Sequence, residues 1–116
     1  MSKTDPLAVV KARRAEDASI GVPAGWVPLM LELHERLVES CPAIEYVQIK
    51  QKWGELRVYV RNRNDAAQEL IAAAELASRT ICEVCGAPGS PCVRRGWYRA
   101  LCPTHAAEME YTEVSS

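Results

Sequence analysis

The chain has 116 residues, a mass of 12.8 kDa and a formal net charge of −1, and it contains no phenylalanine. This length predicts one domain, or one domain with a small accessory lobe. A net charge so close to zero argues against binding of nucleic acid through an overall positive field. The sequence shows neither an 18-residue apolar stretch nor a signal-peptide pattern, so we expect a cytoplasmic protein with no membrane partner.

The charge is distributed unevenly along the chain. Residues 43–105 carry nine Lys or Arg against six Asp or Glu, whereas residues 106–116 carry three acidic residues and no basic residue. A site for a polyanion is therefore expected in the middle to late part of the chain.

The first predicted element is a short, weakly amphipathic helix over residues 4–18. Thr4-Asp5-Pro6 is typical of a helix start. The Gly and Pro residues of segment 19–25 end the helix, because both disfavour regular structure. The basic residues of this helix are expected to form a charged, solvated face.

A second helix is predicted from Trp26 to Ser40, because five apolar residues recur there at spacings of three or four. They are Trp26, Met30, Leu33, Leu37 and Cys41. Pro28 suits the first turn of this helix, and Pro42 stops it. His34 lies beside the apolar stripe and is expected at the surface or at its boundary.

Residues 44–62 predict an antiparallel hairpin with one buried face and a turn at the Lys-Trp-Gly-Glu segment. Its apolar positions alternate with polar ones: Val47, Ile49, Leu56, Val58 and Val60. Its outer face is expected to carry the basic residues, with two tyrosines among them: Lys50, Lys52, Arg57, Arg61, Arg63, Tyr46 and Tyr59.

A third helix is predicted from Asp65 to about Arg79. Asp65 and Gln68 can form a capping box at its start. The apolar residues of this helix are expected at Leu70, Ala74, Ala77 and Ile81. The helix leads directly into a cysteine cluster.

Two pairs of metal-binding residues follow, each with a gap of two. Cys82 and Cys85 precede Gly86, and sixteen residues separate this pair from Cys102 and His105. Such spacing lets four side chains reach one Zn²⁺, and a glycine relieves the tight turn that the first pair needs. Pro103 suits the first turn of a helix, which would place Cys102 and His105 on one face at its N-terminus.

Other chemistries fit the cluster less well. A disulfide in a secreted protein and reduced core cysteines remain as alternatives. A thioredoxin-like motif should open a helix, but loop residues follow Cys85, and the motif of zinc deaminases is absent. A metal-dependent nuclease is disfavoured because only His34 would be left to activate water. Cys41 is expected in the core, and Cys92 is expected to be a neutral thiol.

Two basic regions are candidates for binding nucleic acid or a host protein. The insert of the finger supplies Arg94, Arg95, Trp97 and Arg99, and the outer face of the hairpin supplies Lys50, Arg57, Tyr59 and Arg61. Arginines can hold phosphates while an aromatic ring stacks on a base. The insert can instead offset the negative charge of a zinc–thiolate centre and shield it.

The segments QIKQKWGELRVYV and AELASRTICEVCGAPG…GWYRALCPTHA resemble a group of small bacterial and phage proteins. In that group an Ile-Lys-x-Lys-aromatic-Gly-x-Leu-Arg-x-Tyr hairpin precedes a Cys-x-x-Cys-Gly…Leu-Cys-x-x-His finger. The resemblance covers roughly residues 44–106, and Trp53 stands where phenylalanine is expected. It implies the same four zinc ligands and a phage or mobile-element context, but no established activity.

These patterns predict an α+β fold, with helices packed on a β-hairpin and a C-terminal treble-clef-like zinc finger. We expect residues 1–80 to form the α+β domain, and residues 81–116 to form the finger lobe with a frayed tail. The expected function is a non-catalytic, structural-zinc module that binds a macromolecule, such as nucleic acid. The alternative is a protein-interaction module that modulates a host or defence complex. No small-molecule substrate is evident.

Overall fold

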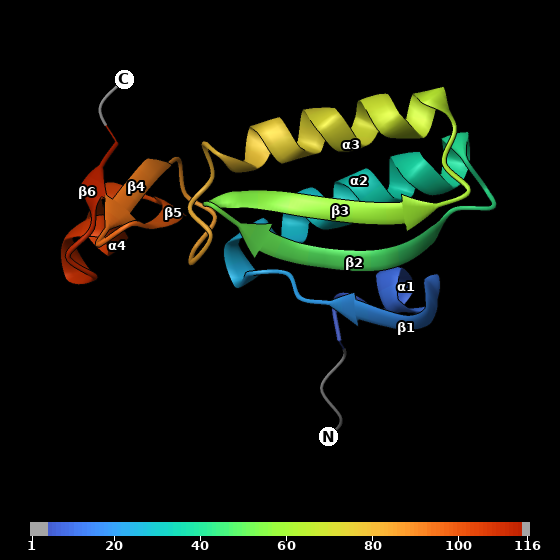
Figure 1. Ribbon diagram of the computed structural model, residues 1–116, viewed down its shortest axis with the longest axis horizontal. Helices are drawn as coiled ribbons and strands as arrows, with labels where there is room; N and C mark the ends of the chain where they lie inside the picture. The colour runs from blue at the N-terminus through green and yellow to red at the C-terminus, as the bar shows by residue number, and fades with distance from the viewer. Residues whose placement is uncertain (1–4, 115–116) are drawn as a thin grey trace.

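Two three-stranded sheets and their helices build an α+β protein, which the computed structural model describes from residue 5 to residue 114 (Figure 1). The first sheet has the order β1-β2-β3, with β1 at Arg14–Ile20, β2 at Glu45–Lys52 and β3 at Glu55–Arg61. The second has the order β5-β4-β6, with β4 at Ser90–Arg94, β5 at Trp97–Leu101 and β6 at Thr112–Glu113. Within residues 5–114, no helix is both long and apolar enough to cross a membrane.

The first sheet packs against two long helices, α2 at Val27–Ser40 and α3 at Asp65–Ser78 (Figure 1). The helix α2 has Pro28 in its first turn and ends before Pro42, as predicted. Its apolar stripe is buried from Trp26 to Cys41 and meets the buried residues of the sheet: Tyr46, Ile49, Leu56 and Val58. The helical periodicity therefore locates the main core correctly.

The predicted first helix is wrong for the described residues, and Thr4 lies outside them. A helix α1 covers only Ala8–Lys11, and the chain then forms β1, which pairs in parallel with β2. Of the strand residues only Ala15 is buried. A strand so polar carries little local signal, and its pairing with β2 outweighs the helical preference of its side chains.

The hairpin of β2 and β3 is confirmed, but its alternation contains a β-bulge. Tyr46 pairs with Val60 and Gln48 pairs with Tyr59, so Val47 is the extra residue. The bulge turns Tyr46 fully into the core and leaves Val47 38% exposed. The predictions that Val47 is buried and that Tyr46 lies on the outer face are therefore wrong.

The helix α3 begins with a different cap from the predicted capping box. The side chain of Asn64 accepts a hydrogen bond from the backbone N–H of Ala67 at 2.8 Å. The buried stripe is also shifted, because it consists of Ala67, Ile71, Ala74 and Ser78. Two side chains of α3 cover the free edge of β3: Glu75 accepts from the Val58 N–H at 3.0 Å, and Ser78 from the Leu56 N–H at 2.9 Å.

Between β5 and β6 the chain forms a helix α4 at Pro103–Glu108, whose start at Pro103 is as predicted. The two sheets with their helices form two lobes, the first before and the second after residue 80. A short 3-10 helix η1, Ala24–Trp26, belongs to the first lobe and contacts the start of the second through a hydrogen bond from the Gly25 N–H to the Glu83 carbonyl. The C-terminal tail was expected to fray, but it is ordered as far as residue 113. There β6 pairs with β4, Glu113 opposite Cys92 and Thr112 opposite Val93. Ser115 and Ser116 lie outside the described residues.

Candidate metal centre and the aromatic surface beside it

The predicted metal ligands Cys82, Cys85, Cys102 and His105 converge, and their ligand atoms all lie within 4.8 Å of one another. The Sγ atoms of Cys85 and Cys102 are 3.8 Å apart. The His105 Nδ1 lies 3.2 Å from the Cys102 Sγ and 3.6 Å from the Cys82 Sγ. A tetrahedral Zn²⁺ with ordinary bond lengths would separate two sulfurs by about 3.8 Å, and sulfur from nitrogen by about 3.6 Å. The cluster can therefore hold a metal ion of this size.

Local backbone structure places each pair of ligands. The Gly86 N–H donates to the Cys82 carbonyl at 2.8 Å, and Gly86 has a φ of 84°, which closes a tight turn around the first pair. The second pair lies at the start of α4, where the Cys102 Sγ accepts from the backbone N–H of His105 at 3.5 Å. These two local structures place the members of each pair, and the antiparallel strands β4 and β5 between the pairs return the chain to the first one.

The surroundings of the cluster favour thiolates, the form of cysteine that binds metals. Burial opposes ionisation of Cys82, but hydrogen bonds from the backbone N–H groups of Cys102, Cys85 and Val84 lower its pKa to about 6. The pKa of Cys102 is lowered by the backbone N–H of His105. The pKa of His105 is raised by its hydrogen bonds to the thiols of Cys102 and Cys82. A bound cation would replace the proton in stabilising these sulfurs.

The remaining cysteines and the second histidine lie outside the cluster. Cys41 is buried and donates to the Asn62 carbonyl at 3.0 Å, which confirms its place in the core. Cys92 is buried as well, and burial raises the pKa of its thiol. His34, predicted at the surface or at its boundary, is buried, with Nδ1 2.8 Å from the Tyr46 hydroxyl, and burial lowers its pKa.

Glu83, which lies between two ligands in the sequence, connects the metal cluster to both sheets. Its side chain is only 4% exposed, and one carboxylate oxygen is 2.5 Å from the Arg99 Nε. The other oxygen accepts from the Gln51 amide at 3.1 Å and from the Ala100 N–H at 3.4 Å. The pair Glu83–Arg99 spans sixteen residues, so no local pattern reveals it. Arg99, a predicted contact residue, is engaged in this network.

A close backbone contact also holds the two lobes together. The Gly25 N–H donates to the Glu83 carbonyl at 2.8 Å, and a Cβ on Gly25 would lie 2.0 Å from the Cys82 carbonyl oxygen. The Trp26 indole donates to the Ile81 carbonyl at 2.8 Å. Only glycine permits so close an approach. The backbone around Cys82 and Glu83 is therefore in direct contact with the first lobe.

The predicted binding residues of the hairpin lie on one face, as the strand pairing requires. Lys50 pairs with Arg57, and the Lys50 Nζ lies 6.0 Å from the centroid of the Tyr59 ring. Arg57 forms an ion pair with Glu55 at 3.8 Å, and Arg61 forms one with Glu45 at 3.9 Å. Both ion pairs are long and partly exposed, so they leave the arginines available to a stronger anion.

In the finger, Arg94 and Arg95 differ from Arg99 in their exposure. Arg94 is exposed and forms an ion pair with Glu110 at 3.6 Å. Arg95 is exposed in the turn between β4 and β5, where it and Gly96 both have positive φ. The adjacent Trp97 is 74% exposed, so it does not cover a zinc core.

A hollow of about 330 Å³ lies between the tips of the two hairpins. It is lined by Gln51, Lys52, Trp53, Gly96, Trp97 and Tyr98. Trp53 is 70% exposed, and its ring stacks against that of Tyr98 at a centroid distance of 6.0 Å and an interplanar angle of 23°. Among these aromatic residues the sequence predicts only Trp97 as a binding residue, although a tryptophan in a two-residue turn is a usable signal.

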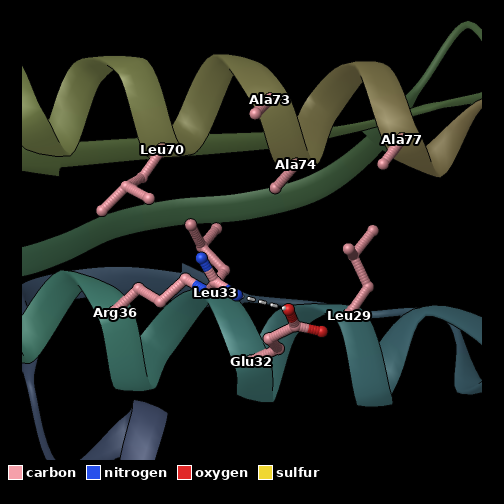
Figure 2. A pocket seen from close by; sticks show the side chains of 8 residues that line it. All are labelled: Leu29, Glu32, Leu33, Arg36, Leu70, Ala73, Ala74 and Ala77. Carbon is pink, nitrogen blue, oxygen red and sulfur yellow. Dashed lines mark hydrogen bonds and ion pairs between the residues drawn. The ribbon is translucent and has the colours of Figure 1, made fainter.

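A second hollow, of about 240 Å³, lies between α2 and α3 (Figure 2). Most of its lining is apolar: Leu29, Leu33, Leu70, Ala73, Ala74 and Ala77. An ion pair of 3.2 Å between Glu32 and Arg36 lies on the α2 side (Figure 2). The lining has no aromatic ring, and its two charged residues pair with each other.

Comparison of the chain with protein families, with curated proteins and with solved structures finds no match.

Proposed function

We propose that the chain is a non-catalytic nucleic-acid-binding module in which a structural Zn²⁺ holds a treble-clef-like finger. The turn at Cys82–Cys85, the hairpin of β4 and β5, and the start of α4 follow one another in the order of that class of finger. Three cysteines and one histidine suit zinc and fill a tetrahedral site, which leaves no open position for catalysis. The role of the metal is then to stabilise the finger and to present its hairpin.

The observation that supports nucleic-acid binding is the group of exposed aromatic rings beside basic side chains at the hairpin tips. Trp97 and Trp53 are among the most exposed large hydrophobic residues described. Lys52 lies in the same hollow, and Arg95 is the neighbour of Gly96 in its wall. Aromatic rings with adjacent cations are typical of surfaces that bind single strands.

A salt titration with fluorescently labelled oligonucleotides tests this proposal. We expect affinity to fall steeply between about 50 and 200 mM salt, because binding of phosphates releases counterions. Replacement of Arg94 and Arg95 by alanine should weaken binding and reduce the salt slope. Arg36→Ala is the matched control, since Arg36 is an exposed, paired arginine on the distant helix α2. Absence of binding to any DNA or RNA at low salt would contradict the proposal.

Protein binding is the second candidate function. The net charge of −1 favours it, as does the apolar groove between α2 and α3, because apolar surface of this kind is common at protein contacts. The resemblance to small bacterial and phage proteins suggests that such a partner would be a host or defence complex. Failure of all nucleic-acid binding, together with a stable complex that survives nuclease treatment, would favour this function over the first.

A further inference from the structure

We infer that the hollow between the two hairpin tips is a stacking site for one unpaired nucleobase, so that the chain prefers single-stranded to duplex nucleic acid. This inference rests on the proposed nucleic-acid-binding function and names the form of nucleic acid and the residues that select it. Trp53 and Tyr98 supply the aromatic faces, with Trp97 and Lys52 at the same hollow.

The walls of the hollow are fixed relative to each other although they come from different sheets. The Gln51 amide donates to the Tyr98 carbonyl at 3.0 Å and to Glu83 at 3.1 Å. A Cβ on Gly54 would lie 3.2 Å from the Arg99 backbone nitrogen, so the turn of the first hairpin rests directly on β5 (Figure 1). A preformed site loses less conformational freedom when it binds a ring.

The exposure of the Trp53 side chain indicates a use other than packing of a core. Trp53 has a φ of 59°, in the left-handed region that bulky side chains rarely adopt. Its ring is nevertheless 70% exposed and contributes nothing to either buried core. The two-residue turn requires this φ, and Asn or Asp is the usual residue at its first position, so the turn does not explain why a tryptophan stands here. The two-residue turn projects the indole beyond the sheet, where a ligand can reach its face.

The chemistry of the lining favours a base over a peptide. The six lining residues include three aromatic rings and one lysine but no carboxylate. The volume of about 330 Å³ lies near the lower limit of about 300 Å³ for ordinary ligand pockets. The hollow therefore suits one planar ring system, with Lys52 placed to meet an adjoining phosphate. Because every base has a flat face that can stack, the site should distinguish single strands from duplexes and should not distinguish one base sequence from another.

The test compares a labelled single-stranded oligonucleotide with the matched duplex, using the zinc-loaded protein and fluorescence anisotropy. Trp53→Ala and Tyr98→Ala should each weaken single-strand binding by about 5- to 150-fold, the range found for loss of one base stack. Duplex binding should be unchanged. Val9→Ala is the control and should have no effect, since it removes an exposed apolar side chain of α1, at the opposite end of the first sheet from the turn that carries Trp53 (Figure 1). Trp53→Tyr keeps an aromatic face and should retain most of the affinity.

Several outcomes would overturn the inference, and they differ from failure of the proposed function. An equal loss of affinity for duplex and single strand in Trp53→Ala and Tyr98→Ala would refute base stacking while leaving nucleic-acid binding intact. Unchanged affinity in variants that are folded would do the same. Trp53-dependent binding of a proline-rich peptide or of a mononucleotide, without binding of the single strand, would assign the hollow to that ligand instead. Failure of the wild-type chain to bind either form of nucleic acid would refute the proposed function itself.

Discussion

The two lobes of the molecule are stabilised by different means. The first has a continuous apolar core that includes Trp26, Met30, Leu37 and Ile49. The second has four fully or nearly buried core residues, and two of them, Cys82 and Cys102, are candidate metal ligands. Burial of apolar surface can support the first lobe, but a core this small needs a metal. A metal ion held by Cys82, Cys85, Cys102 and His105 would therefore do for the second lobe what the apolar core does for the first.

The largest expected effect is therefore a selective loss of the second lobe when the metal is removed. Zinc binding contributes about 10–16 kcal/mol in finger peptides, whereas whole domains have about 5–15 kcal/mol of stability. After treatment with a chelator, backbone amides of residues 82–113 should lose protection from hydrogen exchange. Amides of α2 and β2 should keep most of theirs. Equal protection of both lobes before and after chelation would show that the second lobe does not depend on a metal.

A smaller effect is expected at the junction of the lobes. Arg99→Met removes the partner of the buried Glu83 carboxylate, and loss of one partner from a buried ion pair costs about 3–5 kcal/mol. Because the Arg99 side chain is 31% exposed, we expect the free energy of unfolding to fall by about 2–3 kcal/mol, measured by urea unfolding.

Glu83→Gln is the matched variant at the same junction. It keeps the shape of the side chain and removes the charge, so no unpaired charge is left buried. It should therefore lower the free energy of unfolding by less than Arg99→Met does. If both variants unfold at the wild-type urea concentration, the ion pair does not join the lobes.

Patterns within one segment of the sequence predict the features that depend only on that segment. The stripe of α2, the two-residue turn at Trp53-Gly54 and the ligands Cys82 to His105 follow from spacing and from turn chemistry. Strand β1 and the bulge at Val47 depend on pairing across the sheet, which spacing along one segment does not encode.

The aromatic hollow shows the same limit at the candidate binding site. Trp53 and Tyr98 are 45 residues apart in the sequence and meet only because Gly54 rests on β5. Sequence patterns therefore indicate the metal cluster completely, and the aromatic surface through Trp97 alone.

The central claim is that Cys82, Cys85, Cys102 and His105 hold one Zn²⁺, and the metal content of the purified protein tests it most directly. Elemental analysis by mass spectrometry should give one zinc per chain, and Cys85→Ser should lose it. Cys92→Ser is the matched control, since Cys92 lies in the same lobe but outside the cluster, and it should keep the zinc. A metal-free wild-type protein with a folded second lobe would contradict the claim, as would loss of zinc in Cys92→Ser and not in Cys85→Ser.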